Sequence, residues 1–258
     1  MHTVEHQERE TAYVRADRDG SGDPICFVHG SGGSSAVWKS QHRLGSQHPI
    51  VALDLSGHGD STDVDANPGY STLSAYADDV IAVLEETDAR MLVGNSLGGA
   101  VTMHVLLERA DEVDLDGAIL TGTGARLGVL EDLRWWLEND FERAIEFLHE
   151  PDRLFHDPDQ RLRSISMETM RECGQTVTRR DFLTCHEFDV RDRLHEVDVP
   201  VRAIYGEHDQ LTPPWFHEFL VEEISDADGV EIADAAHLSM LERPTAFNEA
   251  LVGFLERL

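Results

Sequence analysis

The serine at position 96 lies between two glycines, at the point where an apolar segment gives way to a helical one. Residues 91–94 are apolar and predict a strand, and residues 97–109 have the pattern of a helix. A G-x-S-x-G turn between a strand and a helix strains the serine backbone and lifts the hydroxyl above the sheet. Because three fixed positions recur by chance in roughly one chain of this length in ten, other segments must decide whether the motif carries chemistry.

A serine hydroxyl needs a base to take its proton, usually a histidine held by a carboxylate. Two histidines in the C-terminal part are candidates, His217 and His237. His217 lies within a predicted helix over residues 215–223, where a histidine is usually structural. His237 follows a predicted strand, residues 230–233, in a loop of small residues. This position favours His237 as the base.

The acid that orients the base is expected in a loop just beyond another strand. Asp209 follows the predicted strand over residues 200–206 directly. Glu207 in the same loop and Asp234 near the histidine are the competing carboxylates. Because active-site groups gather where strands end, Asp209 is the favoured acid.

A developing oxyanion needs preorganised donors, which two backbone N–H groups can supply. One is the amide of Leu97, directly after the serine. The other is the amide of Ser31 in the glycine-rich segment 29–33, here called the glycine loop. This loop follows a predicted strand over residues 25–29 and precedes the serine motif in the chain, which favours a functional role over an ordinary turn.

Strand and helix candidates alternate along most of the chain, which predicts an α/β fold with a doubly wound, mostly parallel sheet. Further strands are expected at residues 11–17, 50–54 and 117–121, and a helix at 75–86 capped by Ser71 or Ser74, with a terminal helix at 245–258. Residues 124–196 lack strand patterns and predict helices, including 130–139 and 141–149. We therefore predict a core formed by residues 1–123 and 197–258, and a helical cap insertion at 124–196, here called the cap segment. Its candidate apolar faces contain Trp135, Trp136, Phe141 and Phe147.

Five short motifs in this order resemble the α/β-hydrolase superfamily over nearly the whole chain: HGSGG at 29–33, DLSGHGDS at 54–61, GNSLGG at 94–99, GEHD at 206–209 and AAH at 235–237. The resemblance implies Ser96 as nucleophile, Asp209 as acid and His237 as base, with His58 structural. Residues 236–248 look like the tail of 3-oxoadipate enol-lactonases and related small esterases. Residues 94–96 are similar instead to carbon–carbon bond hydrolases of ring-cleavage products. Haloalkane dehalogenases and epoxide hydrolases have an aspartate at the position of Ser96 and are disfavoured.

These residues predict a cofactor-independent serine hydrolase that cleaves a small carboxylic ester through an acyl-enzyme. A lactonase or carbon–carbon bond hydrolase with the same triad is an alternative, and so is a ligand sensor that retains the triad without turnover. The fourteen histidines form no compact metal motif. The glycines at 122–128 follow a strand, but a helical stretch comes after them where a nucleotide site needs a strand that ends in an acidic residue about 20 residues later. We therefore expect neither a metal nor a cofactor.

The charge balance is unusual, since 50 Asp and Glu face 21 Lys and Arg, a formal net charge of -29. Lys39 is the only lysine. Such a chain repels nucleic acid, and acidity spread along its length predicts adaptation to high salt. The sequence has no apolar stretch of membrane-spanning length and no signal-peptide pattern, which predicts a cytoplasmic location. Cys26, Cys173 and Cys185 have no paired spacing, so free thiols are expected; a homodimer stays open.

Overall fold

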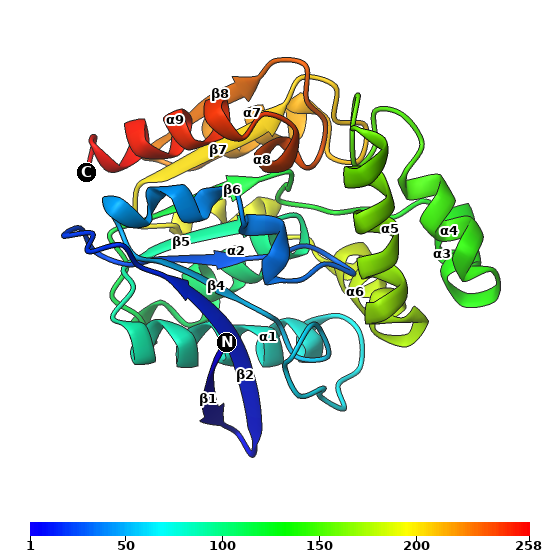
Figure 1. Cartoon of the computed structure of the whole chain (residues 1–258), viewed down its shortest axis with the longest axis horizontal. Coiled ribbons are helices and arrows are strands. Elements are labelled where there is room, and N and C mark those ends of the chain that lie inside the picture. The colour runs from blue at the N-terminus through cyan, green and yellow to red at the C-terminus, as the bar shows by residue number, and fades with distance from the viewer.

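Eight strands form one sheet in the order β1-β2-β4-β3-β5-β6-β7-β8, in a computed structural model that describes residues 1–258 (Figure 1). The first two strands pair antiparallel, β2 pairs antiparallel with β4, and all later neighbours are parallel. β3 to β6 are buried along their whole length, as expected for parallel strands covered on both faces. The predicted α/β class is confirmed. The strands are β1 His2–His6, β2 Arg9–Ala16, β3 Ile25–Val28, β4 Ile50–Leu53, β5 Met91–Asn95, β6 Gly117–Thr121, β7 Val201–Gly206 and β8 Ala227–Ile232.

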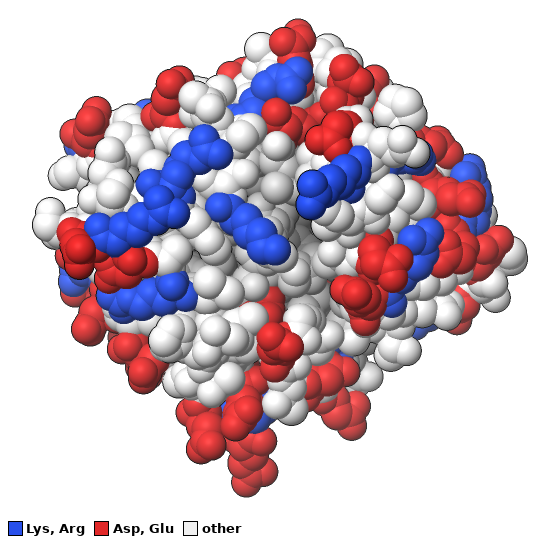
Figure 2. All heavy atoms as spheres, viewed as in Figure 1, with Lys and Arg blue, Asp and Glu red and all other residues white.

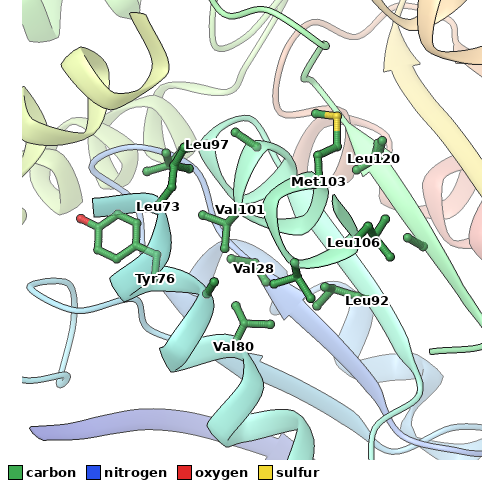
Figure 3. Close-up of a cluster of buried hydrophobic side chains, with 14 of the residues drawn as sticks. Val28, Leu73, Tyr76, Val80, Leu92, Leu97, Val101, Met103, Leu106 and Leu120 are labelled. Carbon is green, nitrogen blue, oxygen red and sulfur yellow. The ribbon is translucent and has the colours of Figure 1, made fainter. Parts of the chain in front are cut away.

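Helices cover both faces of the sheet. One face packs against α1 (Tyr70–Thr87), α2 (Leu97–Glu108) and α7 (Pro214–Glu223), and a short 3-10 turn η3 (Ala110–Glu112) follows α2. Figure 3 shows Val101 of α2 between Val28 of the sheet and Leu73 of α1. The other face packs against η1 (Ser35–Trp38), η2 (Gln41–Ser46), α8 (Ser239–Glu242) and α9 (Pro244–Leu255).

Between β6 and β7 the chain forms helices and no strand, only an isolated bridge between Arg126 and Asp189. The helices are α3 (Glu131–Asn139), α4 (Phe141–Leu148), α5 (Gln160–Cys173), α6 (Gln175–Glu187) and the 3-10 turn η4 (Arg191–Glu196). Figure 1 shows α3 to α6 together at one end of the sheet. These helices lie in the residues that the sequence assigns to the cap segment.

One local prediction is wrong, and one strand was not predicted. The first predicted helix begins at Tyr70 rather than near residue 75, and Gly69 precedes it with φ 87° and no side-chain cap. The Gly69 N–H donates to Thr184 Oγ1 of α6 at 3.0 Å, so a tertiary contact, and not a capping serine, sets this boundary. The missed strand is β1, which is mostly exposed and polar and pairs only with β2. None of the helices has the length and apolarity required to cross a membrane.

Candidate active site

Ser96 connects β5 to α2 with a backbone that L-residues rarely adopt, φ 56° and ψ −116°. The turn is too tight for side chains at its flanking glycines. A Cβ on Gly94 would lie 2.3 Å from the carbonyl oxygen of Gly98, and a Cβ on Gly98 would lie 2.4 Å from the carbonyl oxygen of Val28. The glycines of the motif are therefore required sterically, and the serine has the strained geometry that the sequence predicts for a nucleophile elbow.

His237 and Asp209 form a buried pair, with His237 Nδ1 2.9 Å from Asp209 Oδ2. The other carboxylate oxygen of Asp209 accepts hydrogen bonds from the amides of Leu211 (2.8 Å) and Thr212 (2.9 Å). Burial raises the pKa of the Asp209 carboxyl, but the charge of His237 and the hydrogen bonds from His237 and Thr212 outweigh it, so that the pKa lies below its ordinary value. Asp209 is thus held as a carboxylate that fixes the orientation of the His237 ring.

The loop that contains His237 is tied to the serine turn and to the cap segment. The His237 carbonyl accepts a 3.5 Å hydrogen bond from the side chain of Asn95, the residue before Ser96. Its own amide donates to the carbonyl of Arg153 at 3.2 Å. These bonds bring the loop after β8 beside the end of β5, although the two are far apart in the sequence.

The competing residues lie elsewhere. His217 is fully buried in α7, where its Nε2 accepts a hydrogen bond from the Thr123 amide at 3.0 Å and burial lowers its pKa to about 4. Glu207 and Asp234 are exposed and bond to each other, through the Asp234 amide and a Glu207 carboxylate oxygen, at 3.2 Å. None of the three lines the cavity that contains Ser96 and His237.

The glycine loop lies directly against the serine turn. A Cβ on Gly30 would lie 3.0 Å from Ser96 Cβ, and Ser31 lines the same cavity as Ser96. The amides of Ser31 and Leu97 have no hydrogen-bond acceptor within the protein. Both predicted oxyanion donors therefore belong to segments that meet at Ser96; Ser31 lines the cavity, whereas Leu97 is fully buried and is not among the lining residues.

One buried carboxylate beside the glycine loop escaped the sequence analysis. Asp181 of α6 is fully buried and accepts hydrogen bonds from the Gly32 amide (3.1 Å) and the Tyr76 hydroxyl (2.7 Å), and it pairs with His58 Nε2 (2.9 Å). Burial lowers the pKa of His58, yet the Asp181 charge outweighs it and raises this pKa well above 6.5. Its signal in the sequence is a carboxylate in register with apolar Val177 and Cys185, at i, i+4 and i+8 of a cap helix.

Ser96 and His237 open into a cavity of about 500 Å³ between the sheet and the cap segment. Most of its apolar lining comes from the cap segment, and Phe147 is the one of the four predicted aromatic residues that takes part. Trp135 is instead exposed. The apolar lining residues are Ala36, Val37, Leu127, Val129, Leu130, Leu133, Phe147, Leu154, Leu162, Ile165, Met170, Phe182, Cys185, Leu211, Leu238 and Leu241.

A group of possible metal ligands lies outside this lining. Asp152, His156 and His208 offer atoms within 4.8 Å of one another, and His208 forms a second such set with Glu207 and Asp234. The rings of His156 and His208 are stacked with centroids 3.8 Å apart, and His156 Nδ1 lies 2.5 Å from Asp152 Oδ1.

The sheet order, the strained turn after β5 and the cavity above it define an α/β-hydrolase fold. A model of the alpha/beta hydrolase family matches residues 27–250, and the chain belongs to this family.

Three comparisons place the chain within the family. The pimeloyl-[acyl-carrier protein] methyl ester esterase of Neisseria meningitidis serogroup C is 30% identical over 248 residues, which cover 90% of this chain and 93% of that protein. The 3-oxoadipate enol-lactonase 1 of Acinetobacter baylyi is 25% identical over 98% of this chain and 96% of its own length. A solved thermophilic esterase superposes with a TM-score of 0.86 at 27% identity, over 99% of this chain and 96% of the other.

Proposed function

We propose that this protein is a cofactor-independent serine hydrolase that cleaves a small carboxylic ester with Ser96, His237 and Asp209. The observation that carries the proposal is the buried His237–Asp209 pair at 2.9 Å, whose histidine shares a cavity with a serine in elbow geometry. That combination of base, acid and strained hydroxyl matches the requirements of acyl transfer.

In the proposed reaction the Ser96 hydroxyl oxygen attacks the acyl carbon while His237 Nε2 takes the hydroxyl proton. His237 Nδ1 keeps its proton, and this N–H donates a hydrogen bond to Asp209. The negative charge of Asp209 stabilises the imidazolium that forms. The tetrahedral oxyanion accepts hydrogen bonds from the amides of Ser31 and Leu97. Collapse breaks the bond to the alcohol, which takes the proton from His237, and leaves an acyl-enzyme that water then hydrolyses by the same steps.

The cavity supports an ester whose acyl or alcohol part is largely apolar. Residues 124–196 act in this proposal as a cap that sets substrate size, because they supply most of the apolar wall of the cavity that contains Ser96. A lactone substrate is the second candidate, favoured by the similarity to an enol-lactonase over nearly the whole chain. The triad chemistry is the same for an open ester and a lactone, since both present an acyl carbon bonded to oxygen.

The test is turnover of a panel of esters, lactones, thioesters and ring-cleavage diketones at high salt, measured with the wild type, Ser96→Ala and Ser166→Ala. Ser166 is the matched control because its side chain also lines the cavity, but it bonds to His149 on the cap segment. We expect steady multiple turnover of esters or lactones that Ser96→Ala abolishes and Ser166→Ala retains. Cleavage of the diketones alone would assign a carbon–carbon hydrolase, and a single slow turnover would assign a sensor; either result would overturn the proposal.

A further inference from the structure

The chain has one long segment without any acidic residue, and it forms one side of the cavity. Residues 24–53 contain no Asp or Glu, although these make up 50 of the 258 residues. The segment includes Lys39, the only lysine, and Arg43. Both side chains are exposed, beside η1 and η2. A long acid-free segment of a strongly acidic chain therefore adjoins its candidate active site.

The cations of this segment have no carboxylate partner. Most arginines elsewhere are paired, for example Arg202 with Asp228 and Arg90 with Asp116. Arg43 donates only to the carbonyl of Ser40, and Lys39 forms no ion pair. Some other arginines, such as Arg161, are also unpaired, but they lie outside the cavity lining, whereas the unpaired Lys39 belongs to it.

Two cations reach the cavity itself, and no carboxylate does. Lys39 lines it from the core, and Arg153 lines it from the cap segment. The Arg153 guanidinium lies 3.4 Å from the centre of the Phe147 ring, and its Nη1 donates to Glu150 Oε2 (2.6 Å) and to the Phe147 carbonyl (2.5 Å). Figure 2 shows basic side chains on both sides of the hollow near the centre of this face, and acidic side chains below it and to its right.

We propose that the substrate is an anion: an ester or lactone with a carboxylate or phosphate group that Lys39 and Arg153 bind at the mouth of the cavity. The inference rests on the proposed function, because it places the scissile bond at Ser96. The apolar remainder of the substrate lies against the leucines of the lining, and the charged group stays at the mouth, where it remains hydrated. Without these cations the net charge of the protein would repel such a substrate.

The cations bind a part of the substrate that does not react, so their loss weakens substrate and transition-state binding equally. KM then rises while kcat is retained. An exposed ion pair contributes up to a factor of about 5 in binding, and we expect Lys39→Gln to raise KM about 3- to 5-fold. The effect should diminish as salt is raised, since the interaction is exposed to solvent.

The experiment compares three substrates that share one scissile ester: one with a distal carboxylate, one with a distal phosphate, and the neutral carboxamide. Wild type, Lys39→Gln and Arg161→Gln are assayed at matched ionic strength; Arg161 is an exposed, unpaired cation outside the lining. We expect the wild type to prefer an anionic ester over the carboxamide. Lys39→Gln should remove most of this preference through KM, while Arg161→Gln keeps it. The two anionic arms identify which group the site favours.

Equal kcat/KM for the anionic and neutral esters in the wild type would overturn the inference and leave the proposed function intact. The same holds if Lys39→Gln affects all three substrates alike. Calorimetric binding of the carboxylate ester to Ser96→Ala provides a readout without turnover: binding that weakens in the Ser96→Ala, Lys39→Gln double variant supports the inference, and unchanged binding contradicts it. If the wild type binds the anionic ester but shows no turnover that depends on Ser96, this result would refute only the proposed function.

Discussion

Replacing Asp181 with asparagine tests whether α6 positions the glycine loop. The carboxylate accepts three hydrogen bonds at a fully buried site, from Gly32, Tyr76 and His58. Hydrogen bonds to a charged group contribute about 1.5–3 kcal/mol each, roughly twice as much as neutral ones. Asparagine is neutral, so the contribution of each of the three hydrogen bonds should fall by about half. Part of this loss is offset because the desolvation cost of the buried ion pair is also removed. The net loss in the free energy of unfolding is about 2 kcal/mol. For a domain of this size that lowers Tm by about 4–8 °C.

The stability loss should depend on pH with a definite sign. The Asp181 pKa is lowered below 3.8, so its contribution is present above that value and is lost as the pH falls through the lower folded pKa. The His58 pKa is raised above 6.5, so its contribution is complete below 6.5 and is lost as the pH rises through the higher folded pKa. The difference in Tm between wild type and Asp181→Asn should therefore be largest from about pH 4 to 6.5.

The Asp181→Asn variant should remain folded at the assay temperature, but its kcat should fall. Loss of one oxyanion donor costs about 10²–10³ in kcat, and a loosened Gly32 next to the Ser31 amide should cost about 10- to 100-fold, with KM little changed. Asp192→Asn, at an exposed position of η4, is the control with the same change in charge. Steady-state kinetics and melts across pH provide the measurement. A variant with full kcat would refute the positioning role of Asp181.

Three further predictions concern salt, the acid and the cavity wall. Tm and activity should rise together from low salt to molar KCl, because screening weakens repulsion among 50 carboxylates; a flat or falling series would remove the halophilic interpretation. Asp209→Asn should lower kcat by about 10⁴ through loss of the correct His237 tautomer, whereas Asp234→Asn should be harmless, and the reverse result would reassign the acid. Phe147→Ala should shift the preferred acyl length while phosphonate labelling of Ser96 keeps its rate; an unchanged chain-length profile would argue against a cap that sets substrate size.

The core of the fold was predictable because its strands and helices have local signals. Strand Gly117–Thr121 was placed at its observed bounds, since its apolar run ends at a glycine on both sides. β1 was not predicted, because its five residues are mostly exposed and polar and become a strand only through pairing with β2. The start of α1 was displaced because Gly69 is fixed by Thr184, more than a hundred residues away.

The site shows the same division between local and tertiary information. The positions of Ser96, Asp209 and His237 at the ends of strands are visible in the sequence, and the structure brings these loops together. Asp181 is not visible as a site residue, because its register with apolar Val177 and Cys185 indicates a buried aspartate but not what that aspartate contacts. Its role depends on contacts with Gly32 and His58, which lie more than 120 residues earlier in the chain.

The most direct test of the central claim is the intact mass of the protein after treatment with an organophosphonate at high salt. The serine-hydrolase account predicts one adduct per chain, located on Ser96 by peptide mapping, and loss of that adduct together with all turnover in Ser96→Ala. Ser166→Ala should label like the wild type. An adduct that persists in Ser96→Ala, or turnover that survives the substitution, would contradict the assignment of Ser96 as the nucleophile.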